Sequence, residues 1–449
     1  MSQKGTVLII EETEYLTLID YYEQECSQER ALEVTNFAIS THCKSARLLT
    51  TQARLLIDTR NEEMALRQLR RAEALEPSLL EINLLKAEAL SKLSHYNEAI
   101  SLLGDLKEGR TSEKEELSKI FLQESRIYEK LESYEQMFYA LKESLYQNPT
   151  NQAALKQIWL SVELSRKYNE SISLHQDLIN QDPYSYLAWF NLGHAYYYLL
   201  EYDKAIEAFE FAFLINEKFE FAYRDCAEVC MQLKRYDKAL KCYLAVAEHF
   251  PPDGDLLIHI GECHKHLGKI SQAKIVLYRA LAMEPQNEEI YFHLGDCYAQ
   301  EQGWGSAIYF LKKAIKLEDR REDYYSKLAE IYFFIGEYEK ARTMFDKSVT
   351  IAPEESSYWI AYISFLLNLG EVSQALEVLE MAQDNAVGAE LIYAKAACLF
   401  LLEERKTGLE NLGEALIEDF SIHHLFFKLA PAFSEDRDVK AIIHYYKFD

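Results

Sequence analysis

Two pairs of histidine and cysteine residues recur along the chain at a spacing that suits metal binding. His259 and Cys263 lie one helical turn apart, and His293 and Cys297 repeat that pair 34 residues later, with His266 nearby. Imidazole and thiolate groups one turn apart on adjacent helices are typical zinc ligands. A repeated packing position would produce the same offset, because cysteine is often a small buried residue. We favour packing and predict no metal and no cofactor.

No other residue pattern indicates catalysis. The sequence contains no G-x-S-x-G elbow, no G-x-x-x-x-G-K-[ST] phosphate loop and no H-E-x-x-H metal motif. The glycines of residues 301–307, EQGWGSA, fall in an expected turn between two helices. Cys226 and Cys230 lie one turn apart and are interpreted as inert buried thiols. We therefore predict that the protein is not an enzyme and has no catalytic residues.

The charge balance restricts the class of partner. Asp and Glu number 73 against 48 Lys and Arg, so the formal net charge is −25. Such a chain repels phosphate backbones and anionic membrane surfaces, and it contains no basic run of five residues. We expect another protein or peptide as partner, and neither nucleic acid nor a membrane. The oligomeric state is left open.

Cysteine use and the amino terminus bear on location. The eight cysteines are scattered along 449 residues instead of forming a short disulfide framework. The apolar run at residues 7–10 is followed by acidic residues and is too short for a signal peptide. These features predict a cytoplasmic protein.

Proline spacing identifies the elements that position all of these residues. Six prolines in contexts such as LEPS, NPTN and DPYS follow expected helices, at residues 77, 149, 183, 251, 285 and 353. The last four gaps between them are 34 or 68 residues. A period near 34 is typical of stacked helix-turn-helix units, and proline ends a helix because it lacks a backbone N–H.

Residues 186–219 show one such unit clearly. Its large and small apolar residues stand at helical spacing: Trp189, Leu192, Gly193, Tyr196, Ala205, Phe209 and Ala212. In this order they resemble the W-x2-L-G-x2-Y…A-x3-F pattern of the tetratricopeptide-repeat (TPR) family. The small residues let two helices approach closely, and the large ones fill the gaps around them. The resemblance implies an all-α, right-handed superhelical solenoid.

Stepping this unit along the chain predicts twelve repeats. They start near residues 12, 46, 80, 118, 152, 186, 220, 254, 288, 322, 356 and 389. The predicted parts of one continuous solenoid are a lead segment at 1–11, three degenerate repeats at 12–111, nine repeats at 118–420 and capping helices at 421–449.

Two regions depart from the period. The step from the third to the fourth repeat is 38 residues, and the four extra residues fall in the polar stretch 104–116. We expect a loop there that is long enough to act as a hinge. The tail contains apolar residues that either cover the last repeat or bind a partner: Ile442, Ile443, Tyr445 and Tyr446.

The resemblance also implies a binding surface. In this family the first helix of each repeat lines a concave groove, through the second, fifth, ninth, twelfth and thirteenth residues of the repeat. The ninth residue is acidic in four consecutive repeats: Glu228, Glu262, Asp296 and Glu330. Groove positions also include His194, Phe190, Tyr197, Tyr198, Phe221, Arg224, Phe292 and Phe333. Two alternatives are that cations such as Lys265 neutralise the acids and that the aromatic residues pack between repeats.

These residues favour a protein-interaction scaffold that binds a basic and aromatic peptide or protein segment in an acidic and aromatic groove. The carboxylate clamp of the chaperone-binding relatives does not match, because repeats seven to ten carry acids. Two other functions remain open. One is a peptide-responsive regulatory or sensor protein that closes about the expected hinge, and the other is a structural subunit of a larger assembly.

Overall fold

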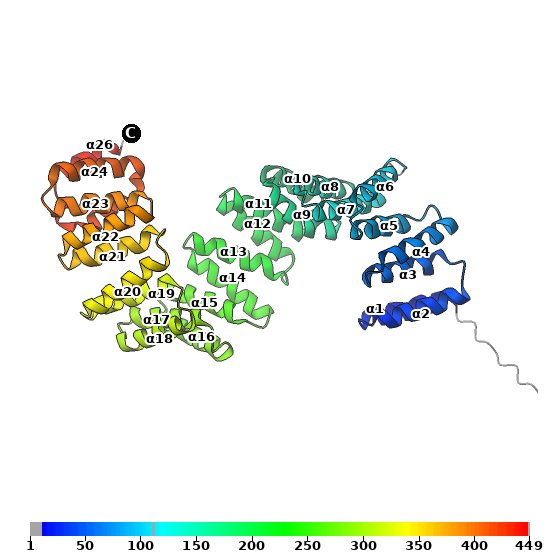
Figure 1. The fold of residues 1–449 in the computed structure, drawn as a ribbon, viewed down its shortest axis with the longest axis horizontal. Coiled ribbons are helices and arrows are strands. Elements are labelled where there is room, and N and C mark those ends of the chain that lie inside the picture. The colour runs from blue at the N-terminus through cyan, green and yellow to red at the C-terminus, as the bar shows by residue number, and fades with distance from the viewer. Residues whose placement is uncertain (1–10, 110–112, 448–449) are drawn as a thin grey trace, which may run out of the picture. The chain divides into compact units, whose positions relative to one another are not determined.

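The structure, a computed structural model, describes residues 11–109 and 113–447 (Figure 1). Within those residues it contains 26 α-helices, two short 3-10 helices and no strand, which confirms the predicted all-α class. The helices group into an N-terminal body that ends at Val229 and a C-terminal body that begins at Cys230. None of the described helices is long and apolar enough to cross a membrane.

The helices follow one another as twelve pairs. The first helices of the pairs are α1(Glu12–Gln24), α3(Ala46–Asp58), α5(Leu80–Lys92), α7(Lys114–Lys130), α9(Gln152–Ser165), α11(Tyr186–Tyr198), α13(Glu220–Gln232), α15(Gly254–His266), α17(Glu288–Gln300), α19(Glu322–Phe334), α21(Ser356–Asn368) and α23(Ala389–Leu401). The second helices are α2(Gln28–Thr41), α4(Glu62–Leu75), α6(Tyr96–Gly109), α8(Tyr134–Gln147), α10(Tyr168–Gln181), α12(Tyr202–Ile215), α14(Tyr236–His249), α16(Ile270–Met283), α18(Trp304–Leu317), α20(Tyr338–Ile351), α22(Val372–Asn385) and α24(Arg405–Glu418).

Eleven of the twelve predicted repeat starts coincide with the first residue of a helix. The division into parts at 1–11, 12–111, 118–420 and 421–449 stays a prediction, and most of the lead segment lies outside the described residues. The tail forms η1(Phe420–Ile422), α25(His424–Leu429), η2(Pro431–Phe433) and α26(Arg437–Tyr446). In the C-terminal body α25 packs on α23, and α26 packs on α24.

The expectation of a hinge loop at residues 104–116 is wrong for the part that the structure describes. Helix α6 continues to Gly109, and α7 begins at Lys114, four residues before the predicted start. The insertion therefore lengthens α7 to 17 residues, against 13 in α5. Lys and Glu are good helix formers, and acidic residues such as Glu115 are favourable near a helix amino terminus. Residues 110–112 lie outside the described residues.

Each helix pair turns through one residue with a left-handed backbone conformation. In the twelve described pairs the φ angle of this residue lies between 53° and 79°. Three of these residues are glycines, whereas the others carry side chains, such as Leu200 at φ 62°. The next N–H, that of Glu201, then donates to the carbonyl oxygen of Tyr196 at 2.9 Å and closes the end of α11. This hydrogen bond satisfies an otherwise unpaired helix-end carbonyl and offsets the backbone strain.

A close approach between the two helices fixes the packing of repeats that have a glycine on the first helix. A Cβ atom placed on Gly193 of α11 would lie 2.5 Å from the ring of Phe209 on α12. The same contact recurs in the C-terminal body, where a Cβ on Gly261 would lie 2.8 Å from Leu277. Phe209 is only 1% exposed, so its ring has little room to move. Glycine is retained in these helix interiors because the packing requires it.

We expect Gly193→Ala to lower the free energy of unfolding of the N-terminal body by about 1–3 kcal/mol, because the added methyl overpacks the contact with Phe209. Gly104→Ala is the matched control, since a Cβ at this glycine of α6 meets nothing within 4 Å. Its greater helix propensity should stabilise the body by about 0.5–1 kcal/mol. Chemical denaturation of both variants checks the pair, and a stabilising Gly193→Ala would contradict the packing argument.

One histidine is buried in the N-terminal body without a charged partner. His175 of α10 is fully inaccessible, and its Nδ1 lies 2.8 Å from the carbonyl oxygen of Ser171. Its Nε2 has no hydrogen-bond partner. Burial lowers the pKa of His175 from 6.5 to about 4, because the protonated ring would lose its hydration. The folded protein therefore holds this imidazole neutral.

The lowered pKa of His175 predicts a pH-dependent stability. The unfolded chain binds a proton near pH 6.5 and the folded one only near pH 4, so the stabilising contribution is complete above pH 6.5. It is lost as the pH falls from 6.5 toward 4, by up to about 3 kcal/mol. Hydrogen exchange of α9 to α11 at pH 7 and pH 5 should show this loss. His175→Leu should show a smaller change, and equal pH slopes would refute the assignment.

Candidate partner-binding site

A pocket opens between the first helices of the fifth, sixth and seventh repeats in the N-terminal body. It encloses about 280 Å³. Its lining comes from α9, α11, α13 and one residue of α12: Trp159, His194, Tyr197, Tyr198, Phe209, Asp225, Glu228 and Val229. Four of these, namely His194, Tyr197, Tyr198 and Glu228, are groove residues predicted from the sequence. We call this cavity the aromatic–acidic pocket.

Aromatic rings form the walls of the aromatic–acidic pocket. Trp159 stacks on His194 with ring centroids 4.7 Å apart, and its centroid lies 5.5 Å from that of Tyr198. The edge of His194 meets Phe209, which is buried beneath it, at 5.2 Å. Phe190 supports His194 from the side, at 4.5 Å. The ring faces present negative electrostatic potential to whatever enters the cavity.

Carboxylates complete the pocket. Asp225 Oδ2 lies 3.1 Å from His194 Nε2, and the side chain of Asp225 is 26% exposed. Beside the cavity, the hydroxyl of Tyr198 donates to Glu163 Oε1 at 2.7 Å, and this hydrogen bond raises the pKa of Tyr198 to about 12. Glu228 adds a second carboxylate to the lining. Rings and carboxylates together suit a guanidinium or ammonium group.

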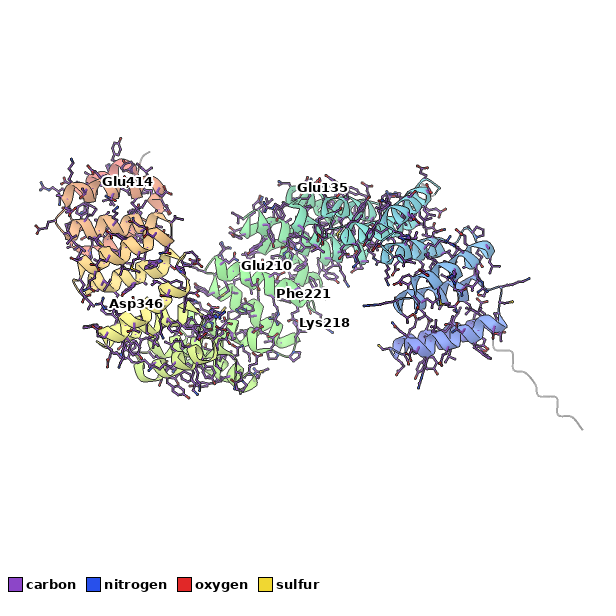
Figure 2. The ribbon with its side chains drawn as sticks, in the orientation of Figure 1. Glu135, Glu210, Lys218, Phe221, Asp346 and Glu414 are labelled. Carbon is purple, nitrogen blue, oxygen red and sulfur yellow. The ribbon has the colours of Figure 1, made fainter. Side chains whose placement is uncertain are left out.

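Two further predicted residues of the N-terminal body lie outside the pocket lining. Phe221 is 65% exposed on α13, and its ring contacts Phe219 at 5.9 Å (Figure 2). Arg224 is half-buried, and its Nε donates to Glu220 at 2.7 Å on the same helix. Phe221 is therefore available to a partner, whereas the guanidinium of Arg224 is engaged within α13.

The acidic residues of the C-terminal body are compensated by neighbouring cations. Asp296 is only 7% exposed, and its carboxylate lies 2.9 Å from Lys265 Nζ and 3.3 Å from Lys327 Nζ. Lys327 also binds Glu330 at 3.1 Å. Burial alone would raise the pKa of Asp296, but the charges of Lys265 and Lys327 lower it below the ordinary value. Glu262 lies 3.7 Å from His266.

Neutralisation by lysine, one of the two alternatives from the sequence, therefore applies to Asp296. Glu228 belongs to the N-terminal body and the other three acids to the C-terminal body. The predicted row of four carboxylates in a single groove stays a prediction. Its supply of negative charge is smaller than the sequence suggests, because one member is buried in an ion-pair network.

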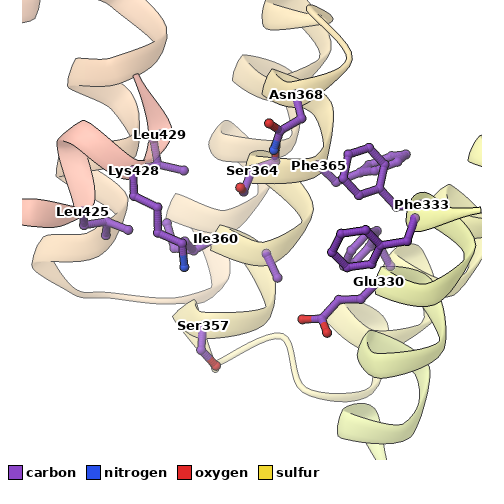
Figure 3. Close-up of a pocket in the computed structure, with 13 residues that line it drawn as sticks. Glu330, Phe333, Ser357, Ile360, Ser364, Phe365, Asn368, Leu425, Lys428 and Leu429 are labelled. Carbon is purple, nitrogen blue, oxygen red and sulfur yellow. The ribbon is translucent and has the colours of Figure 1, made fainter. Parts of the chain in front are cut away.

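A second groove crosses the first helix α21 in the C-terminal body and encloses about 410 Å³ (Figure 3). Predicted residues Glu330 and Phe333 of α19 form one side, and Leu425, Lys428 and Leu429 of α25 form the other. The floor is mixed in polarity: Ser357, Ile360, Ser364 and Asn368. Phe292, in contrast, stacks on Tyr324 of the next repeat at 4.8 Å. Its ring packs between repeats, which was the alternative for the aromatic residues.

Two of the histidines with metal-like spacing stack on tyrosine rings, and the two cysteines are buried. His259 stacks on Tyr243 at 5.2 Å, and His266 stacks on Tyr236 at 4.3 Å. Burial raises the pKa of the Cys263 thiol to about 12 and that of Cys297 to about 11. Across the residues that the structure describes, no group of three or more His, Cys, Asp or Glu could hold a metal ion.

Sequence reasoning missed four lining residues of the aromatic–acidic pocket, and two of them, Trp159 and Asp225, supply a ring wall and a carboxylate. Trp159 is the eighth residue of its repeat and Asp225 the sixth, and neither position was among the five expected to face the groove. The spacing of Trp159 and His194, one repeat plus one residue, is the signal that would have placed them side by side. Asp225 carries no comparable signal, because acids are common at helix surfaces in this chain.

Models of the tetratricopeptide-repeat family match three segments of the chain, residues 186–219, 254–287 and 322–355. These segments are the sixth, eighth and tenth predicted repeats. The chain is therefore a tetratricopeptide-repeat protein, as the sequence predicted. Proteins of this kind bind other proteins or peptides, and their repeat fold is typically not that of an enzyme.

A curated relative is the BBSome complex member BBS4 of Bos taurus, which is 26% identical over 133 residues. The match covers 30% of this chain and about a quarter, 25%, of that relative. Among solved structures, the chain is similar to one in the APC/C hetero-tetramer Cut9–Hcn1. The match covers 91% of this chain and 97% of the matched chain, at 14% identity and a TM-score of 0.41. The match to the thermophilic TPR protein TTC0263 of Thermus thermophilus covers 41% of this chain and 100% of the matched chain, at 26% identity and a TM-score of 0.36.

The ion-pair network around Asp296 predicts a large cost for removing one lysine. Lys265→Met should destabilise the C-terminal body by about 3 kcal/mol, because it leaves a buried carboxylate partly uncompensated. It should also raise the pKa of Asp296. Lys119→Met is the control, since Lys119 and Glu115 form an exposed pair worth less than about 1 kcal/mol. Denaturation measures the stability of the two variants, and carboxyl titration by NMR measures the pKa of Asp296. Equal effects of the two substitutions would show that the network does not stabilise Asp296.

Proposed function

We propose that this protein is an interaction scaffold whose first-helix faces bind an extended or helical segment of another protein, with a preference for basic and aromatic residues. The aromatic–acidic pocket is the observation that supports this proposal most directly. It combines the rings of Trp159 and Tyr198 with the carboxylates of Asp225 and Glu228 within about 280 Å³. Nothing in the proposal requires chemistry on the bound segment.

The pocket would recognise a Lys or Arg side chain by two effects. A cation over the ring faces of Trp159 or Tyr198 gains about 0.5–2 kcal/mol, with the larger values where water is excluded. The carboxylate of Asp225, which already lies beside His194, would accept hydrogen bonds from the same cation. The net charge of −25 adds long-range attraction for a basic segment and speeds its encounter.

The groove over α21 would contribute contact area more than charge. Its rim has apolar residues on both sides, with Phe333 on α19 and Leu425 on α25 (Figure 3). The charge of Glu330 on this rim is compensated by Lys327. An aromatic or large aliphatic side chain of the bound segment would bury its surface here, at about 25 cal/mol per Å².

The two alternative functions differ in their support. The sensor proposal depended on a hinge loop at residues 104–116, and the described part of that stretch is helical. A subunit of a larger assembly is the second candidate, because part of the chain is similar to a BBSome complex member. Such a subunit would also bind protein segments, so the same pocket would serve either an assembly or a transient partner.

Peptide binding tests the proposal. We expect fluorescently labelled peptides rich in Lys, Arg and aromatic residues to bind more tightly than their Glu-substituted counterparts, and less tightly at high salt. Trp159→Ala should weaken this binding about tenfold or more, and Asp225→Asn should weaken it mainly for the basic peptides. Fluorescence anisotropy provides the measurement.

Tyr309→Ala is the matched control, because Tyr309 is an aromatic residue of the second helix α18 and is 56% exposed. Its binding should equal that of the parent protein. The proposal fails if Trp159→Ala binds the basic peptides as tightly as the parent does, or if high salt does not weaken their binding to the parent.

A further inference from the structure

The carboxy-terminal tail contains a pocket whose charged residues are all cationic. It encloses about 380 Å³ between η1, α25 and α26. Among the residues that the structure describes, Lys440 and Lys447 line it together with His423, His444 and Ser434, and no acidic residue does. Because acids outnumber bases by 73 to 48 in the sequence, a lining without any acid departs strongly from the rest of the chain. We call this cavity the tail pocket.

Three of the described acids that lie close in sequence to the tail pocket have basic partners of their own. Arg405 of α24 binds Asp436 at 2.7 Å and Asp438 at 2.8 Å. Glu435 pairs with Lys440, but both side chains of this pair are more than half exposed, so the pair holds the lysine weakly. The interactions with Arg405 engage the carboxylates of Asp436 and Asp438, and neither residue lines the cavity.

The remaining surface of the tail pocket is apolar. Phe420, Phe427 and Ile443 line it and are only partly buried against the core of the C-terminal body. The ring of His423 stacks on Phe420 at 4.8 Å, and His423 Nδ1 lies 2.9 Å from the carbonyl oxygen of Phe420. The pocket thus offers an apolar floor with hydrogen-bond donors and cations around its edge.

We propose that the tail pocket binds a short acidic segment of a partner protein, in which Asp or Glu residues flank a bulky apolar side chain. The apolar side chain would cover Phe420, Phe427 and Ile443, and the carboxylates would pair with Lys440 and Lys447 at the rim. Charge complementarity selects this occupant, because both lysines attract carboxylates and repel a basic segment. This site is separate from the aromatic–acidic pocket and has the opposite charge preference. The tail therefore has a binding role in addition to covering the last repeat.

The test uses the full chain and two labelled peptides of twelve residues, one with Glu flanking Phe and Leu and the other with Lys in place of Glu. In the Trp159→Ala variant, in which binding at the aromatic–acidic pocket is weakened, we expect the acidic peptide to bind more tightly than the basic one. Lys440→Glu combined with Lys447→Glu should weaken binding of the acidic peptide at least tenfold. Lys440→Gln combined with Lys447→Gln should weaken it to a smaller extent, and circular dichroism verifies that these variants fold.

The control is Lys312→Glu combined with Lys316→Glu on α18, which changes the net charge by the same amount and should weaken binding less than twofold. Trp159→Ala should leave binding of the acidic peptide unchanged, so failure of this proposal is distinguishable from failure of the proposed function. Equal losses in the two charge reversals would refute the proposal, because binding would then follow net charge alone. Self-association that sedimentation detects without peptide, and that the tail reversal abolishes, would also overturn it in favour of a second copy of the chain.

Discussion

The contact between a small residue on the first helix and a large one on the second is the constraint from which the rest of the fold follows. The eighth residue of a repeat faces the twenty-fourth, as Gly193 faces Phe209 and Gly261 faces Leu277. Because the glycine has no Cβ, the two helices approach until the large side chain touches backbone, and that distance sets the pairing geometry. The pairs then stack, since second helices also pack on the first helix that follows them, as α8 packs on α9 and α14 on α15.

The fifth repeat departs from this constraint at both positions together. Its eighth residue is Trp159, and its twenty-fourth is His175. An indole cannot occupy a position where a methyl group would already overpack, and Trp159 stacks on His194 of the following repeat. The same repeat therefore supplies the wall of the aromatic–acidic pocket and the buried neutral imidazole. Loss of the regular small-to-large contact in the fifth repeat thus accompanies the aromatic surface of the aromatic–acidic pocket.

Periodicity explains why so much of the fold could be predicted and why some of it could not. The 34-residue spacing of small and large residues located eleven helix starts, because most repeats place the same kind of contact at the same position. It gave no indication of the left-handed turn residues, since at Leu200 the strain is offset by backbone hydrogen bonds that any residue can make. The sequence predicts a loop where α7 extends before Leu117, because charged residues favour both loops and exposed helices.

The candidate site was harder to predict, because charges pair across repeats. The ninth residue of one repeat contacts the twelfth residue of the repeat before it or the sixth residue of the repeat after it. The observed pairs are Arg54–Glu23, His194–Asp225, Asp296–Lys265 and Asp296–Lys327. A run of acids at the ninth position therefore says little about free charge until these neighbours are included. The charge available to a ligand is what these pairs leave uncompensated. Asp296 is neutralised by two lysines, whereas Asp225 in the aromatic–acidic pocket lies beside His194, which stacks on Trp159.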